Sequence, residues 1–291
     1  MMYRKVLAFI LLTVGLGING LIAQNQKISF FHPAVSAKGI IAFDSNLAGK
    51  NAVYVLTKEG GFKQISTEGY MASHPAWSSD GRYLSYESLR DGNFDIYVYD
   101  FRKKKELRFT DSDSVDAISQ WRPDGHVIYE SNRSGRFQMY QQAFGTREEA
   151  RLITDKVEKV NYPVWSHSGK QVLFSTFFEG DMELCLSDAE FNKITRLTFS
   201  KGVDGWASWS ADDEKIVFTS KRSGSNEIYL INPDGSGLER LTTDTENSAM
   251  PHFLPDGSGI IFMSRQGGEP SAIYSLDLST RKQTKLTQIE R

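Results

Sequence analysis

The 291-residue chain is poor in cysteine and in net charge. Its single cysteine, Cys185, excludes an intrachain disulfide, so the burial of side chains must stabilise the fold. Lysine and arginine number 34 and aspartate and glutamate 36, which gives a formal net charge of −2. Because nucleic-acid binding needs a basic surface, we predict no nucleic-acid partner.

Motifs of common enzyme classes are missing as well. The sequence contains no G-x-S-x-G nucleophile elbow, no phosphate-binding glycine loop, no H-E-x-x-H and no C-x-x-C. The lone thiol, which we expect to be buried and inert, makes a cysteine nucleophile a poor alternative. We therefore predict a protein that is not an enzyme and that uses no cofactor.

Long apolar runs are absent except at the start of the chain. A short basic segment, Arg4 and Lys5, precedes the apolar run 6–16, which is too short for a spanning helix and typical of an export signal. We predict a signal peptide over residues 1–23 and a mature domain over 24–291 without a membrane span. The mature protein would then be periplasmic or secreted.

The residues before the expected cleavage site depart from the usual pattern. The expected cut follows Ala23, and the residue at the −3 position, Leu21, is larger than the small residue preferred there. An uncleaved membrane anchor remains the alternative.

A repeat of 44 residues organises the rest of the chain. Large apolar residues recur at this spacing at Trp77, Trp121, Trp165, Trp209 and Phe253. A parallel threonine series is Thr110, Thr154, Thr198 and Thr242, extended at spacings of 43 and 45 by Thr67 and Thr287. A large apolar residue in fixed register is typical of packing between repeats, so we expect the tryptophans in the core rather than in a ligand platform.

Each repeat holds four strand-like segments, of which the second repeat is the clearest example. Its expected strands are 74–78, 83–88, 95–100 and 106–110, with a tight turn at Asp80-Gly81. Four short strands per repeat of this length are the signature of a propeller blade.

The predicted fold is therefore an all-β, six-bladed β-propeller with four antiparallel strands per blade, forming one domain. The first repeat is divergent and starts near Phe31. A closed ring leaves no long exposed sheet edge, whereas the alternatives, a sandwich or an open array, would do so. Whether residues 27–31 pair with the last blade to close the ring is left open.

The repeat motif P-x-W-S-x-D-G, an apolar strand, S-x-R-x-G, I-Y and R-L-T resembles the TolB-type propeller repeat, best at 75–100 and 209–242. The resemblance covers the mature chain and implies the same fold. Related propellers occur in binding proteins, peptidases and pectin-degrading lyases. The family's propeller contacts a peptidoglycan-associated lipoprotein, so the resemblance implies a protein partner in the cell envelope.

This chain also departs from the family pattern. Full-length TolB has an α/β domain before its propeller, for which we expect no space here. Val35 stands near the tryptophan position of the first blade, and the fourth blade reads STFFEGD at 175–181, without the loop arginine.

The loops that join one blade to the next vary in sequence, as functional loops on a fixed scaffold do. They span 68–74, 111–119, 155–162, 199–206 and 243–250. Counting three residues back from the apolar marker of each repeat gives His32, His74, Ile118, Tyr162, Trp206 and Met250. We predict that these positions surround the mouth of a central channel. The binding-site candidates among them are His32, His74, Tyr162, Trp206 and Met250.

Two further sets of candidates remain. Arg90, Arg133 and Arg222 of the S-x-R-x-G loops would suit an anionic partner, although a repeated arginine that bonds its own loop is the alternative. We predict no bound metal; if one were bound, His32, His74 and His252 would be its candidate ligands.

We thus predict an exported, monomeric, non-catalytic propeller that acts as a protein–protein interaction scaffold of the bacterial cell envelope, similar to the Tol-Pal system. The alternative is a glycan-binding propeller, or a metal-dependent glycan-cleaving propeller of the lyase type.

Overall fold

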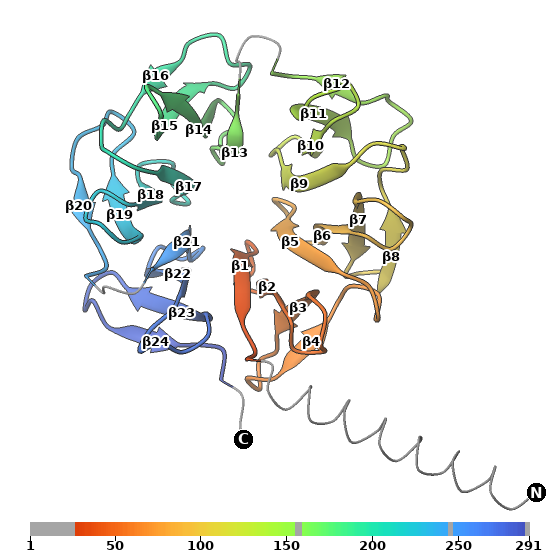
Figure 1. Ribbon diagram of the computed structural model, residues 1–291, viewed down its shortest axis with the longest axis horizontal. Helices are drawn as coiled ribbons and strands as arrows, with labels where there is room; N and C mark the ends of the chain where they lie inside the picture. The colour runs from red at the N-terminus through yellow and green to blue at the C-terminus, as the bar shows by residue number, and fades with distance from the viewer. Residues whose placement is uncertain (1–26, 155–158, 244–246, 289–291) are drawn as a thin grey trace, which may run out of the picture.

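The computed structural model describes residues 27–154, 159–243 and 247–288 of the chain. The described part contains 24 strands in six four-stranded antiparallel sheets, which surround a central channel as blades of a propeller (Figure 1). The predicted fold class is confirmed. The proposed signal peptide, residues 1–23, lies outside the described residues.

Each blade uses four consecutive strands, paired in chain order. The first three blades are β1 (Phe30–Val35), β2 (Ile41–Ser45), β3 (Ala52–Leu56) and β4 (Phe62–Gln64); β5 (Ala72–Trp77), β6 (Tyr83–Ser88), β7 (Asp95–Asp100) and β8 (Lys105–Arg108); β9 (Asp116–Trp121), β10 (His126–Ser131), β11 (Gln138–Ala143) and β12 (Arg151–Leu152).

The last three blades repeat this order. They are β13 (Asn161–Trp165), β14 (Gln171–Phe178), β15 (Asp181–Asp188) and β16 (Thr195–Arg196); β17 (Asp204–Trp209), β18 (Ile216–Ser220), β19 (Glu227–Ile231) and β20 (Glu239–Arg240); β21 (Ala249–Phe253), β22 (Gly259–Ser264), β23 (Ala272–Asp277) and β24 (Gln283–Lys285). The first strand of each blade lines the centre of the ring and the fourth lies at the rim (Figure 1).

The core lies between neighbouring blades, where the tryptophan series packs. One buried cluster joins Leu173 and Leu184 of the fourth blade to Trp209 and Phe218 of the fifth. Burying an aromatic or aliphatic side chain of this size stabilises the fold by about 1.5–3 kcal/mol. The prediction that the tryptophans pack between blades is confirmed, and Cys185 is fully buried in the adjacent cluster as expected.

The threonine series has a defined role in the third strand of each blade. The Thr110 hydroxyl accepts a hydrogen bond from the Ile96 N–H at 2.9 Å, and the same bond recurs at Thr154, Thr198, Thr242 and Thr287. In the first blade Ser66, not Thr67, accepts this bond, from the Val53 N–H at 3.0 Å. Thr67 was therefore the wrong marker: the hydroxyl needed by the blade is one residue earlier.

The ring closes with the same backbone bond that links other blades. The N–H of Ala72 donates to the Asn51 carbonyl of the preceding blade at 2.9 Å, which also explains why β5 starts two residues earlier than predicted. At the closure the N–H of Phe30 donates to the Ser271 carbonyl, also at 2.9 Å. β1 is a strand of the first blade, so residues 27–31 help to close the ring through the Phe30 bond to the last blade and not as one of its strands.

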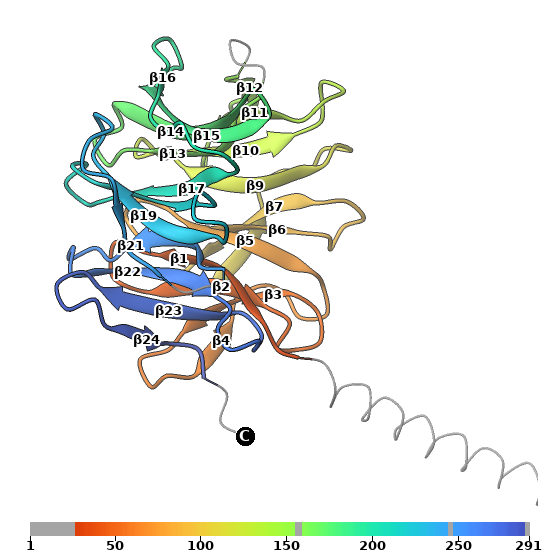
Figure 2. The same cartoon turned by 60° about the vertical axis from the view of Figure 1, so that its left-hand side comes forward.

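The first and last blades lie side by side in both ribbon views (Figure 1 and Figure 2). Their shared cluster contains Phe30 and Phe43 of the first blade and Ile261 and Ile273 of the last. The closing contact is therefore an apolar seam of the same kind as the other blade contacts. In the part of the chain described, no helix is long and apolar enough to cross a membrane.

Candidate binding site at the channel mouth

The innermost strands β1, β5, β9, β13, β17 and β21 enclose a cavity of about 440 Å³ along the axis of the ring. All six residues predicted to surround the channel mouth line this cavity: His32, His74, Ile118, Tyr162, Trp206 and Met250, here called the mouth ring. The repeat register therefore brings together residues that are far apart in the sequence.

The six residues of the mouth ring share one backbone conformation. Each has a positive φ, between 43° and 58°, which places it in the left-handed region. The cause is a β-bulge at this point of each first strand, as at the register shift between Ser73 and Ala76 in β5. For residues other than glycine this conformation costs of order 1–3 kcal/mol, so the rest of the blade must hold it.

At some of the bulges, the N–H of the mouth-ring residue donates a hydrogen bond to a side chain of the preceding blade. Glu87 Oε2 accepts the Ile118 N–H at 2.8 Å, and Thr219 Oγ1 accepts the Met250 N–H at 3.0 Å. Asp44 Oδ1 accepts the His74 N–H at 3.3 Å. Each of these bonds ties a second strand to the bulge of the next blade.

On one side of the mouth, two imidazoles are hydrogen-bonded to two carboxylates. His32 Nδ1 is 2.7 Å from Asp44 Oδ1, and His74 Nδ1 is 2.8 Å from Glu87 Oε1. The two imidazole rings are neighbours, with centroids 3.7 Å apart. Each carboxylate orients its imidazole so that Nε2 is the ring nitrogen left over for a ligand.

The electrostatics of this side favour the ionised forms of His74 and Glu87. Burial opposes protonation of His74, but the hydrogen bond to Glu87 and the negative charges of Glu87, Asp44 and Glu130 outweigh it and raise the pKa of His74. Burial would raise the pKa of Glu87, but the His74 contact and the Ile118 N–H lower it. His74 and Glu87 thus behave as an ion pair at the mouth.

Glu130 is the third carboxylate of this region. Burial, followed by the negative charge of Glu87, raises its pKa, and the opposing charges of Lys159 and His74 are too weak to reverse the shift. The three carboxylates Asp44, Glu87 and Glu130 come from equivalent positions in β2, β6 and β10, opposite the residue that precedes each bulge.

The opposite side of the mouth is aromatic. The rings of Tyr162 and Trp206 lie with centroids 5.0 Å apart, next to Met250 on the following blade. Burial, and then the negative charge of Glu130, raises the pKa of Tyr162, so its hydroxyl keeps its proton at neutral pH. The mouth is therefore divided into an acidic and imidazole half and an aromatic half.

The carboxylates of the acidic half were not predicted from the sequence, although a repeated sequence pattern marks them. An acid directly precedes a serine near the end of the second strand in three successive blades, at 44–45, 87–88 and 130–131. The bulges have a sequence pattern as well, because proline follows the mouth-ring residue in four blades: Pro33, Pro75, Pro163 and Pro251.

The candidate metal ligands do not all meet. His252 lies two residues beyond the mouth ring, deeper in the channel, whereas His32 and His74 are adjacent at the mouth. Burial lowers the pKa of His252 to about 4, so its imidazole is neutral at physiological pH. Over the described residues, no three histidine, cysteine, aspartate or glutamate side chains are grouped as metal ligands.

The loop arginines bond carboxylates of their own blades, and Arg90 also reaches Thr67 at the end of the first blade. Arg133 donates to Asp116 at 3.1 Å and lies over the Tyr140 ring at 4.8 Å. Arg222 repeats this arrangement with Asp204 and Tyr229, and Arg90 bonds Glu106 and Thr67. These contacts favour the architectural interpretation of the arginines over a ring that faces a partner.

A family model described as the TolB beta propeller domain matches residues 16–176 and 145–291. The chain belongs to this family. In the structure, the matched repeat corresponds to one four-stranded blade, with its tryptophan packed against the neighbouring blade and a bulge in its inner strand.

Individual relatives are more distant. The chain is 29% identical over 129 residues to an uncharacterized protein of Agrobacterium fabrum, and 31% identical over 84 residues to the Tol-Pal system protein TolB of Desulfosudis oleivorans. These matches cover 44% and 28% of this chain, and 44% and 19% of the relatives. The chain thus spans less than half the length of the curated relatives it matches.

The solved structure of TolB from Acinetobacter baumannii has the same fold. Its superposition gives a TM-score of 0.66 at 21% identity and covers 77% of this chain and 56% of that chain. At this identity the likeness concerns the propeller architecture alone.

Proposed function

We propose that this TolB-type propeller is an exported, non-catalytic binding module of the cell envelope. A protein partner docks on its mouth face, defined as the end of the ring that carries the second-to-third-strand loops and the connections between blades. The partner covers the channel mouth and contacts the mouth ring. The protein works in the periplasm or after secretion.

One observation carries this proposal: the exposed large hydrophobic side chains are concentrated on the mouth face. Nine such side chains are exposed among the described residues, and six of them lie at this end of the ring: Tyr70, Met71, Leu89, Phe137, Phe177 and Phe199. Exposed apolar patches of this kind mark interaction sites, and aromatic side chains supply much of the binding free energy there.

The fourth blade adds to this surface. Its strands β14 and β15 have eight residues each, and their hairpin takes the place of the S-x-R-x-G loop. Phe177 near the hairpin tip is half exposed, and Phe199 in the next connection is 75% exposed. Arg196 lies 4.5 Å from the Phe199 ring and 4.7 Å from the Phe178 ring, which fixes these aromatics in place.

The non-catalytic part of the proposal is supported by the chemistry of the thiol and of the sequence. Burial raises the pKa of Cys185 to about 12, so a thiolate is unavailable at neutral pH. The envelope partner is supported by the relative named as a Tol-Pal system protein, and a peptidoglycan-associated lipoprotein is the first candidate.

The test is recovery of the partner from the organism's own crosslinked cell envelopes. The full chain with a C-terminal tag is compared with the double variant Phe177→Ser/Phe199→Ser and with Tyr162→Ala/Trp206→Ala. Leu107→Ser/Leu238→Ser is the matched control, because both leucines are exposed but lie away from the mouth face. Both mouth-face variants should lose a partner that the wild type and the control recover.

Equal recovery in all four proteins would place the interface elsewhere. Recovery of no specific protein by the wild type would reject a protein-binding role.

A further inference from the structure

Below the mouth ring the channel has a second layer, here called the chamber. Its residues follow the mouth-ring residues by two positions in each innermost strand: Ala34, Ala76, Gln120, Val164, Ser208 and His252. The small side chains of the first two blades leave space on one side. The cavity volume of about 440 Å³ is within the usual range of small-molecule sites, about 300–1,000 Å³.

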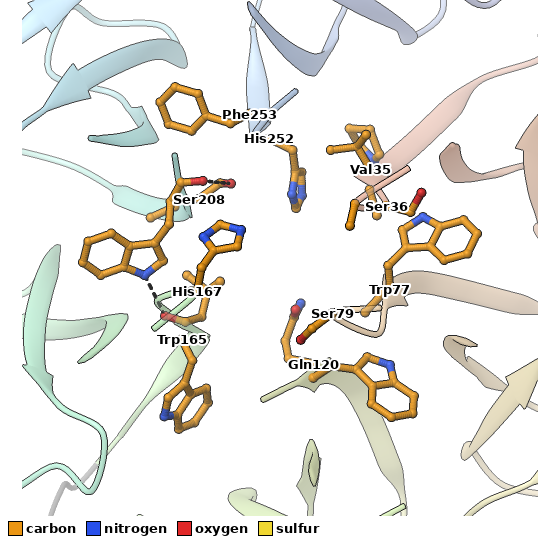
Figure 3. A pocket seen from close by; sticks show the side chains of 18 of the residues that line it. Val35, Ser36, Trp77, Ser79, Gln120, Trp165, His167, Ser208, His252 and Phe253 are labelled. Atoms are coloured by element: carbon orange, nitrogen blue, oxygen red, sulfur yellow. Dashed lines mark hydrogen bonds between the residues drawn. The ribbon is translucent and has the colours of Figure 1, made fainter. Parts of the chain in front are cut away.

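Two polar side chains of the chamber are turned toward this space. Figure 3 shows the imidazole of His252 and the carboxamide of Gln120 pointing into the open centre from different sides of the ring. Neither side chain has a hydrogen-bond partner within the described residues. An inward-facing amide and imidazole without protein partners offer donors and acceptors to a ligand.

The chamber is also electrically neutral. None of its six residues carries a charge at neutral pH, because burial keeps the His252 imidazole unprotonated with a pKa of about 4. The carboxylates of the mouth do not offset that burial at His252. A charged group of a ligand would meet the same desolvation cost without an opposite charge to compensate.

We propose that the chamber binds a small neutral molecule that carries hydroxyl or amide groups, held by hydrogen bonds to Gln120 and His252. The aliphatic walls Ala34, Ala76 and Val164 take its apolar face, and Tyr162 and Trp206 of the mouth ring close over it. This site does not depend on the proposed protein partner, because it lies inside the ring rather than on the mouth face.

Two kinds of neutral molecule carry such hydroxyl or amide groups, a saccharide and a peptide with an amide side chain. Two neutral probes distinguish them. N-acetylglucosamine and N-acetylasparagine amide are titrated into the full-length protein carrying labelled histidine, and the ring signals of His252 are followed by NMR. At least one probe should shift these signals saturably. Glucosamine and glucuronate, which are close in size but charged, should bind at least tenfold more weakly than N-acetylglucosamine.

Variants locate the site. Gln120→Ala and His252→Asn should each weaken probe binding about fivefold to tenfold, the loss expected for one hydrogen bond. The Gln120 variant is read at His252, and the His252 variant by signals transferred from protein to probe. His126→Asn, at the start of β10 and outside the cavity lining, is the control and should bind like the wild type.

The proposal is overturned if neither neutral probe binds saturably, if charged probes bind equally well, or if both chamber variants retain wild-type affinity. None of these results would affect recovery of a protein partner on the mouth face.

Discussion

The tryptophans of the repeat occupy equivalent places but have different hydrogen bonds. Trp121 Nε1 donates to Ser85 Oγ of the preceding blade at 2.9 Å. Trp77 Nε1 is buried and has no partner among the described residues. The residue of the first blade that corresponds to Ser85 is Ala42, since each is paired with the second residue after the bulge start. The Trp77 N–H therefore lacks an acceptor because Ala42 stands where the next blade has Ser85.

We expect Ala42→Ser to stabilise the protein by about 0.5–1.5 kcal/mol, because its hydroxyl would accept the Trp77 N–H. The reverse change, Ser85→Ala, should destabilise by about 1–3 kcal/mol, because it leaves the Trp121 N–H without an acceptor. Urea denaturation of both variants measures the two differences. Destabilisation by Ala42→Ser would mean that packing around Ala42 has no room for a hydroxyl.

His252 makes stability depend on pH. Its pKa falls from 6.5 to about 4 on folding, because burial disfavours the charged ring. Below pH 6.5 the unfolded chain binds a proton that the folded protein excludes, so His252 lowers stability as the pH falls from about 6.5 toward 4. Between pH 6.5 and 5 this loss is about 1.5 kcal/mol.

His252→Asn should therefore lose less stability than the wild type over this interval, by about that amount. Free energies of unfolding at pH 6.5 and 5 for both proteins provide the measurement. Parallel pH dependences in the two proteins would show that the His252 ring can be protonated in the folded state. His126→Asn serves as the control for loss of a histidine as such.

At the scale of the element, the bulged inner strand is the feature that builds the mouth. Six strands carry the bulge at the same place, and five different residue types share its backbone angle there: histidine twice, isoleucine, tyrosine, tryptophan and methionine. A β-branched residue such as Ile118, at φ 49°, is the most strained of the set. The repeated bulge indicates that the backbone, rather than a particular side chain, is what the blade requires.

Ile118→Gly should be more stable than Ile118→Ala by about 1 kcal/mol, because glycine adopts a positive φ without a steric cost. In an ordinary strand position glycine is instead the less stable of the two. The difference between the two variants cancels the loss of the isoleucine side chain, and thermal and urea unfolding both measure it. If alanine proved the more stable residue, the bulge would not be strained.

The second and third strands of the blade were the easiest to predict. The bounds of β6 and β7 agree with the expected 83–88 and 95–100. Both strands are buried on two faces and are rich in aromatic and aliphatic residues, and flanking turns rich in polar residues define their ends. The fourth strand of the second blade was predicted at 106–110 and ends two residues earlier, since β8 is Lys105–Arg108. In the third blade the fourth strand, β12, has only two residues. A strand at the rim has one neighbour and little apolar burial to define its ends.

The site was predicted in part for a related reason. The repeat spacing was enough to select the six mouth-ring positions, since equivalent residues of a ring must meet at its axis. The pairing of His74 with Glu87, or of Ile118 with that same carboxylate, joins different strands and blades. Such contacts depend on the bulge and on register, which the spacing of residues along one chain does not contain.

At the scale of the whole molecule, the propeller is a ring of six similar units with one break in the chain. The bond from the Phe30 N–H to Ser271 repeats the bonds from Ala72 to Asn51 and from Ser248 to Asn226. Ile28 and Leu286, near the first and the last described residues, pack on the same apolar cluster at the seam. In its backbone bond and its apolar packing the seam therefore resembles the other blade contacts, where the chain is also covalently continuous.

This equivalence predicts that the break can be moved. A circular permutant that begins at Gly69, in the exposed connection between the first two blades, and joins residue 288 to residue 27 through a linker of about six residues should fold to the same ring. Its free energy of unfolding should differ from the wild-type value by no more than about 1–2 kcal/mol, because closing a short loop costs little more at one place than at another. The control keeps the native ends and carries the same linker inserted before Gly69. A permutant several kcal/mol less stable than this control would contradict the prediction. It would show that the covalent connection between the first two blades contributes more stability than a linker at the seam between the last and the first blade.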